Sequence, residues 1–308
     1  MEKNRKIQIY CLLAASLVIG LFGAACLFLG IFGEYNDALG YFNTNSLFAP
    51  VVYCCMAAGP VLGLVGAVML RDYRAPDSVL PGRMLSKVAY LLGAFAVIVG
   101  TAADIAAKVM AENVVITLPD ALSWLLGAVS VAALVISSFN TDGGKVKAVV
   151  SLMGFATVFY CVSKVLALYF DQSVAVNSPI KFICQAAYLS YMLVFTAEVG
   201  LSLGKGEMYS KYVFALCTAV AVGGICSVAA VVTTVTGVAC ASFTGIDAVA
   251  KLGLFLYAAL RLFLVTKMEV TKAEKTAKGS KKKKNDESAV TEADTVPEEY
   301  FEDGNVGE

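Results

Sequence analysis

The chain has 308 residues, of which 58% are hydrophobic and 16% charged, and its 24 basic and 24 acidic side chains cancel. Soluble domains are about 45–50% apolar and about 25% charged, so this composition excludes an ordinary soluble protein. The absence of histidine removes the commonest general base and the commonest metal ligand.

Apolar segments of membrane-spanning length follow one another along the chain. A helix needs about 17–25 residues to cross the hydrocarbon core, and lipid offers no partner to a backbone that is not helical. The sequence therefore predicts an all-α integral membrane protein, a bundle of about eight transmembrane helices. The predicted spans are residues 7–33, 50–70, 88–109, 121–139, 148–170, 182–203, 212–236 and 246–266.

Basic residues alternate with these spans. They gather in the N-terminal segment, in the loops after the second, fourth and sixth spans, and in the C-terminal tail. Because short cytoplasmic loops are enriched in Lys and Arg, this pattern predicts an even number of helices with both termini in the cytoplasm. The opposite loops carry acidic residues instead: Glu34, Asp37, Glu112, Asp120 and Asp171.

Matching sequence pairs suggest an internal repeat. Tyr41-Phe42 after the first span matches Tyr169-Phe170 after the fifth, and Asp120-Ala121 at the fourth matches Asp247-Ala248 at the eighth. These matches favour a parallel four-plus-four repeat of residues 7–139 and 148–266 within a transmembrane domain of residues 1–266. The alternative is chance, because dipeptide matches at helix ends are common.

Ionisable residues inside spans are costly and mark candidate functional sites. Asp104 in the third span and Lys164 in the fifth lie at the same predicted depth in the outer leaflet, where an ion pair can form. Asp247 and Lys251 stand one helical turn apart in the eighth span, also near the outer face. These four residues indicate either an outward-facing polar vestibule or structural ion pairs whose side chains reach the headgroups.

Three further features of the spans leave alternatives open. Glu198 in the sixth span and Arg261 in the eighth can pair across the bundle or reach the interface separately. Pro60 in the second span is a candidate helix kink, as at some transporter binding sites. Its neighbours Gly59 and Gly63 have the small-residue spacing of close helix contacts, which favours a packing role.

Residues 267–308 form a charged tail that the sequence predicts to be disordered and cytoplasmic. Lysines dominate its first part and acidic residues dominate from Asp286 onward. The basic part can contact anionic lipid headgroups, and a purely solubilising tail is the alternative. The candidate headgroup contacts are Lys278, Lys281, Lys282, Lys283 and Lys284.

Catalytic and cofactor motifs are missing from the sequence. It contains no phosphate-binding loop, nucleophile elbow, zinc-ligand set or dinucleotide-binding motif. Its nine cysteines have no CxxC spacing and are expected to be small buried hydrophobic residues. We therefore expect no enzyme activity, no cofactor, no metal and no nucleic-acid partner.

The segment Asn177-Ser178-Pro179-Ile180-Lys181, followed by Gln185, resembles multi-span membrane proteins of clostridia-like bacteria. That group has no assigned activity, so the resemblance implies a bacterial cytoplasmic membrane and no site.

Two functions remain: a small-solute or ion permease, favoured by the repeat and the outer charges, and a non-transport scaffold or sensor subunit, favoured by short loops and a charged tail.

A peptide covering residues 267–284 is expected to bind vesicles that contain anionic lipid, because each lysine contributes about 1 kcal/mol near a negative surface. Co-sedimentation with vesicles of increasing anionic content measures this binding. Binding that does not depend on anionic lipid would rule out the headgroup role.

Overall fold

The computed structural model describes residues 2–36, 40–43, 45–75, 83–110, 116–139, 144–171, 175, 177–238, 240, 243, 245–268 and 270–272. The side chains of residues 2, 83, 144–148 and 272 are outside that description. The tail lysines Lys278 and Lys281 to Lys284 also lie outside the described residues.

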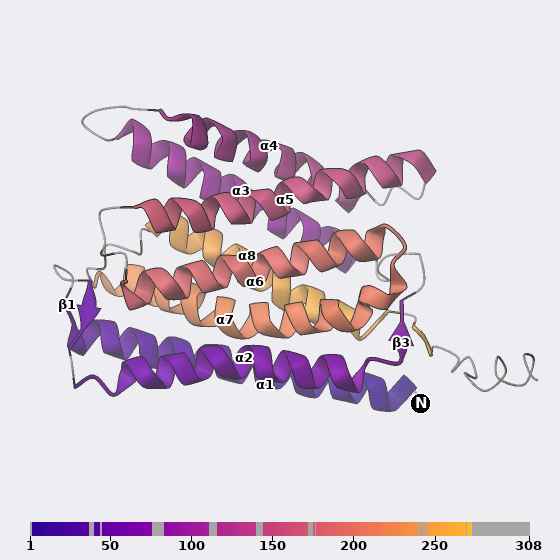
Figure 1. Cartoon of the computed structure of the whole chain (residues 1–308), viewed down its shortest axis with the longest axis horizontal. Coiled ribbons are helices and arrows are strands. Elements are labelled where there is room, and N and C mark those ends of the chain that lie inside the picture. The colour runs from indigo at the N-terminus through magenta and orange to yellow at the C-terminus, as the bar shows by residue number, and fades with distance from the viewer. Residues whose placement is uncertain are drawn as a thin grey trace, which may run out of the picture. The chain divides into compact units, whose positions relative to one another are not determined.

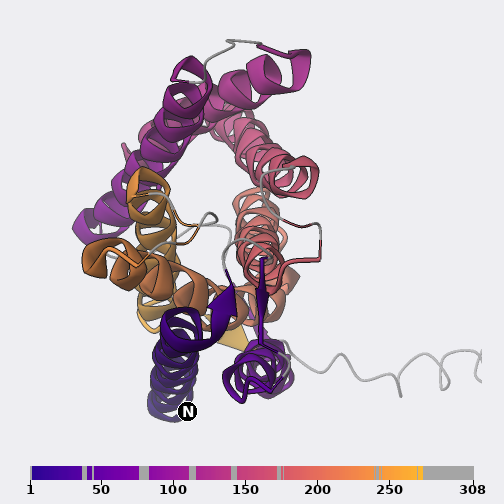
Figure 2. The ribbon, with the colours of Figure 1, turned by 90° about the vertical axis from the view of Figure 1, so that its left-hand side faces the viewer.

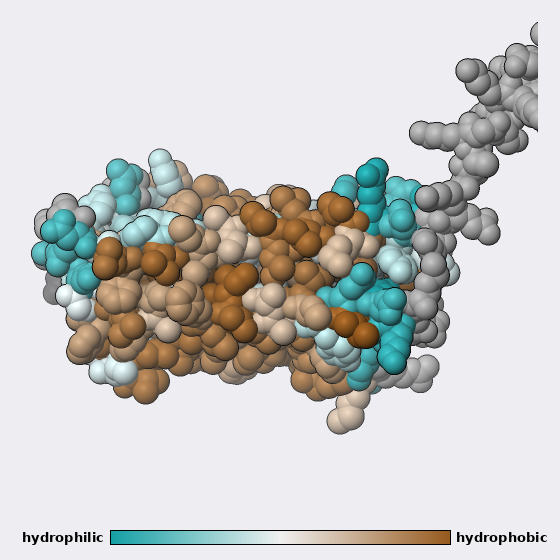
Figure 3. Space-filling model, turned by 90° about the horizontal axis from the view of Figure 1, so that it is seen from below, coloured by the Kyte–Doolittle hydropathy of each residue, from teal (hydrophilic) through white to brown (hydrophobic). Residues whose placement is uncertain are grey.

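Within the described residues, eight helices are long and apolar enough to cross a membrane, which confirms the predicted all-α bundle (Figure 1). Figure 3 shows a hydrophobic surface between two hydrophilic ends on one face of the protein. The chain is therefore a multi-pass membrane protein. The helices are α1 Glu2–Glu34, α2 Phe48–Met69, α3 Arg83–Val109, α4 Leu118–Ser138, α5 Gly144–Phe170, α6 Pro179–Ser202, α7 Tyr209–Thr236 and α8 Gly245–Val265.

Local sequence explains where several helices begin and end. At the start of α4, the backbone N–H and the hydroxyl of Thr117 both donate to the Asp120 carboxylate, at 3.0 and 2.7 Å. Pro179 opens α6, where its missing N–H costs no hydrogen bond. Helix α7 ends at Thr236 and is capped by Gly237, whose φ of 70° is left-handed and suits glycine.

Two short antiparallel pairs mark the ends of the bundle (Figure 1). Strands β1 (Tyr35–Asn36) and β2 (Tyr41–Phe42) pair between α1 and α2. Strand β3 (Tyr73–Arg74), which follows α2, pairs with β4 (Thr271–Lys272), which follows α8. We call the end of the bundle with β1 and β2 the β1 end, and the end with β3 and β4 the β3 end.

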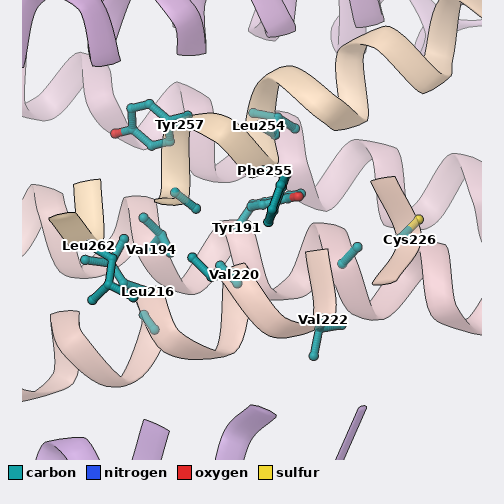
Figure 4. Packing of buried hydrophobic residues seen from close by; sticks show 14 of the residues in the cluster. Tyr191, Val194, Leu216, Val220, Val222, Cys226, Leu254, Phe255, Tyr257 and Leu262 are labelled. Atoms are coloured by element: carbon teal, nitrogen blue, oxygen red, sulfur yellow. The ribbon is translucent and has the colours of Figure 1, made fainter. Parts of the chain in front are cut away.

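Six helices form a closed ring. Each helix from α3 to α8 packs on the next, and α8 packs on α3. Helices α1 and α2 pack on each other and on α7, on the outside of the ring (Figure 2). Helix α7 is the most buried: 83% of its most apolar stretch is buried, against 28% for α4. It therefore forms the core, and Figure 4 shows Leu216 and Val220 packed there.

The helix contacts differ from those of an exact two-fold repeat. Such a repeat would give α3 and α7 equivalent neighbours. In the described residues, α7 packs on α1, α2, α6 and α8, whereas the main partners of α3 are α4 and α8. The repeat of residues 7–139 and 148–266 stays a prediction from the sequence.

Small residues allow close contact with α7. A Cβ atom on Gly63 would lie 2.7 Å from the carbonyl oxygen of Phe214, and one on Gly59 would lie 2.9 Å from the Cβ of Ala221. Helix α2 continues unbroken through Pro60. The glycines around Pro60 therefore have the packing role that their spacing indicated.

The beginning of the predicted tail is attached to the bundle. Arg5 is buried in α1 and donates to the carbonyl oxygen of Met268 at 2.7 Å. Met268 is itself buried, and β4 continues the attachment to Lys272. The compact unit accordingly extends to Lys272, beyond the predicted domain boundary at residue 266.

Substituting Gly63→Val is expected to destabilise the fold by about 1–3 kcal/mol, because the new side chain would collide with the α7 backbone. Gly33→Val is the matched control, since no atom lies within 4 Å of a Cβ there. Thermal unfolding of the purified protein in detergent measures both variants. Equal unfolding temperatures would contradict close α2–α7 packing.

Candidate functional site

Asp104 and Lys164 form an ion pair near the β1 end. The Nζ atom of Lys164 on α5 lies 2.6 Å from the Oδ2 atom of Asp104 on α3. Lys164 also donates to the carbonyl oxygen of Gly100 at 3.1 Å and is only 4% exposed. Helices α3 and α5 are separated by α4 in the ring, so this contact crosses the inner side of the ring.

A second pair lies beside it on α8. Lys251 is fully buried, and its Nζ atom lies 2.5 Å from the Oδ2 atom of Asp247, one turn away. The hydroxyl of Tyr188 on α6 donates to Asp247 at 3.4 Å. The positions 104, 164, 247 and 251 indicated by the sequence thus carry two ion pairs.

The two pairs interact with each other. Lys164 attracts Asp247, and Asp247 repels Asp104. We call Asp104, Lys164, Asp247 and Lys251 the β1-end cluster; its two acidic and two basic side chains balance. Because α3, α5 and α8 all contribute, only the assembled ring brings these residues together.

Glu198 and Arg261 pair across the bundle toward the β3 end, which resolves the alternative left open by the sequence. Arg261 on α8 is fully buried and donates to the carboxylate of Glu198 on α6. The Tyr257 hydroxyl donates to the same carboxylate, and the guanidinium carbon lies 4.0 Å from the centroid of the Tyr90 ring. We call Glu198, Arg261, Tyr257 and Tyr90 the β3-end cluster. Its ion pair joins α6 and α8, which lie on either side of α7 in the ring.

Polar and aromatic residues lie between the two clusters. Ser227 on α7 donates to the backbone carbonyl of Lys251 at 2.8 Å and lies 3.4 Å from the hydroxyl of Tyr191. Phe195 stacks on Tyr257 with ring centroids 5.3 Å apart. Figure 4 shows Tyr191 and Tyr257 in this part of the core. Asp247 and Arg261 are about 21 Å apart along α8 at 1.5 Å per residue, so the clusters span most of the bilayer core.

Sequence reasoning missed the residues that connect the clusters. Tyr188, Tyr191 and Phe195 share one face of α6 with Glu198, which the sequence had already indicated, and the four recur every three or four positions. Helical periodicity could therefore have revealed the three aromatic residues. Cys184 and Cys226 are buried as expected, but their Sγ atoms also lie 3.5 Å apart. Nothing in the sequence pairs two positions on separate helices in this way.

Within the described residues, no group of three or more His, Cys, Asp or Glu side chains is arranged to hold a metal ion. The chemistry that the two clusters offer is therefore that of charges, hydroxyls and aromatic faces. Such groups can bind an ion or a small polar solute, or transfer protons along hydrogen bonds.

No protein-family model, curated protein or solved structure matches this chain.

Substituting Glu198→Gln is expected to cost about 3–5 kcal/mol of stability, because it leaves Arg261 charged and unpaired in the core. The double variant Glu198→Gln/Arg261→Met removes both charges and should recover much of that loss. Lys108→Gln is the control, since its pair with Asp120 is partly exposed and worth under about 1 kcal/mol. Unfolding in detergent measures all three variants. A Glu198→Gln variant as stable as the control would contradict the pairing.

Proposed function

We propose that the protein is a permease for a small solute or an ion in the bacterial cytoplasmic membrane. The observation that carries this proposal is the placement of the charged residues. Lys164, Lys251, Glu198 and Arg261 are all at least 90% buried and form ion pairs within the ring of α3–α8. Intramembrane charges facing a bundle interior are typical of substrate and ion pathways.

The energetics support a functional role for these charges. Burying an ion pair costs several kcal/mol per ion in desolvation, and apolar residues of similar volume often stabilise a core equally well. A bundle selected for stability alone would have no need of three such pairs. Ion pairs can also exchange partners with a passing charged solute, which apolar side chains cannot do.

The paired charges also suggest how the substrate is recognised. The β1-end cluster has no net charge, so a solute that carries both a positive and a negative group can replace the internal partners without leaving an unpaired charge. A single ion would need a counter-ion or a proton to keep the balance. Both kinds of solute belong in the transport test.

Charge asymmetry supports an orientation with both termini in the cytoplasm. The described basic residues of the N-terminal segment and of the loops after α2 and α6 gather at the β3 end, where β3 and β4 also pair. At the opposite end of the bundle, Glu34 is the last residue of α1 and Asp171 follows α5. The positive-inside rule then assigns the β3 end to the cytoplasm.

A scaffold or sensor subunit is the second candidate, and one observation favours it. The contact of Arg5 with Met268 and the β3–β4 pair fix the root of the charged tail to the bundle. A fixed root positions a tail for a partner protein. Recovery of a stoichiometric partner with the purified full chain, together with no flux in vesicles, would favour this function.

Purified protein in proteoliposomes is expected to raise the flux of at least one solute above that of protein-free vesicles. The panel contains H⁺, Na⁺, K⁺, and small zwitterionic and anionic solutes. The Lys251→Met variant should reduce that flux at least tenfold, because Asp247 loses its partner, whereas Lys108→Gln should leave it unchanged.

Size-exclusion chromatography establishes that each variant is folded before reconstitution. Absence of flux for every solute class in the wild type would overturn the permease proposal. Flux that is equal in Lys251→Met and wild type would remove the β1-end cluster from the pathway.

A further inference from the structure

A cavity of about 600 Å³ lies at the β3 end, between three segments that are far apart in the sequence. One wall is formed by Arg74 of β3 and by Ala75, and a second by the connection from α6 to α7. Thr271 of β4 closes a third side. This volume is within the usual range of about 300–1,000 Å³ for small-ligand sites.

The walls of this cavity are held together by specific contacts. The backbone N–H of Ala75 donates to the carbonyl oxygen of Gly206 at 3.2 Å. A Cβ atom on Gly206 would collide with the carbonyl oxygen of Ala75, so the close approach requires glycine. Gly204 turns the chain after α6 with a φ of 83°. The cavity is therefore a built feature of the fold.

The lining of the cavity is basic. Arg74, Lys205 and Lys211 contribute three positive charges, and Glu207 contributes one negative charge. Arg74 pairs with Glu207 at 3.1 Å, while among the described residues Lys205 and Lys211 form no ion pair with an acidic side chain. Two positive charges are left in excess beside the hydroxyl of Thr271, so the cavity suits an anion.

The position of the cavity indicates which anions can reach it. Helix α6 ends at Ser202 and α7 begins at Tyr209, so Lys205 and Lys211 lie within about one helical turn of the ends of two spans. The headgroup layer extends several ångströms beyond the hydrocarbon core. Phosphates of lipid headgroups, and phosphate esters in the adjacent water, are anions that occur at this level.

The sequence that follows β4 has mainly the same sign of charge as the cavity lining. The residues that follow Lys272 are rich in lysine as far as Lys284. Glu274 is the one acidic residue in this stretch, and the next is Asp286. The excess positive charge of the lining therefore suits a ligand from outside the chain.

We infer that this cavity binds a phosphate-bearing anion through Lys205, Lys211 and Arg74. A ligand with two phosphodiester groups, as in cardiolipin, matches the two excess positive charges, and a lysine–phosphate contact needs no fixed geometry. Because Thr271 belongs to β4, a bound phosphate would also contact the strand from which the charged tail continues. This site is separate from the tail lysines, and it does not depend on the permease proposal.

Native mass spectrometry of the full chain in detergent tests the site with cardiolipin, phosphatidylglycerol, phosphatidylcholine and glycerol 3-phosphate as probes. Cardiolipin should bind at least tenfold more tightly than phosphatidylcholine. The Lys205→Gln/Lys211→Gln variant should lose at least tenfold in cardiolipin affinity. The matched control is Lys3→Gln/Lys87→Gln, which removes two exposed lysines outside the cavity and should bind as the wild type does.

Two further arms sharpen the result. Glu207→Gln should strengthen binding, because it removes the only acidic side chain among the described lining residues and frees Arg74. A chain that ends at Lys272 should still bind. Competition by glycerol 3-phosphate would assign the site to soluble phosphate esters, and lipid binding without such competition would assign it to a headgroup.

Three outcomes would overturn the inference. They are equal affinity for phosphatidylcholine and cardiolipin, an equal loss in the control variant, and loss of binding in the chain that ends at Lys272. The last outcome would show that the tail lysines, and not the cavity, bind the lipid.

Discussion

Hydrocarbon cannot solvate charge, and this constraint governs the arrangement of the bundle. Arg261 and Lys251 are fully buried in spanning helices, so each needs an acidic partner at contact distance. Glu198 and Asp247 provide these partners. Because the Glu198–Arg261 and Asp104–Lys164 contacts join helices that are not ring neighbours, the charges restrict how the six helices can be placed around one another.

The lipid environment also determines how helices pack around α7. Water is absent from the bilayer core, so apolar side chains gain little by leaving lipid for protein, and close van der Waals contact decides which faces associate. Gly20 of α1 and Gly59 and Gly63 of α2 allow that contact with α7. The larger apolar side chains of α1 and α2 that remain exposed, such as Phe22 and Val68, suit a lipid environment.

Much of this architecture is local in the sequence and could be predicted from it. Span length identified all eight helices, and depth along the helix placed Asp104 beside Lys164. The ring could not be predicted, because the neighbours of a helix in lipid depend on the shapes of whole helix faces. The partner of Glu198 stayed ambiguous for this reason: Arg261 lies 63 positions away, and no periodicity connects α6 with α8. The basic cavity stayed hidden because three distant segments form it.

The contact between Arg5 and Met268 has a consequence for how the protein is made. A ribosome synthesises Arg5 before α2 to α8, and its partner carbonyl only after α8. Helices α1 and α2 likewise precede α7, on which both of them pack, by more than a hundred residues. The α1–α2 pair is therefore made before α7, the helix on which it packs, and the contact of Arg5 with Met268 can form only after α8 has been synthesised. The contact of Arg5 with Met268 thus distinguishes a bundle that contains α1 to α8 from one whose synthesis stopped before Met268.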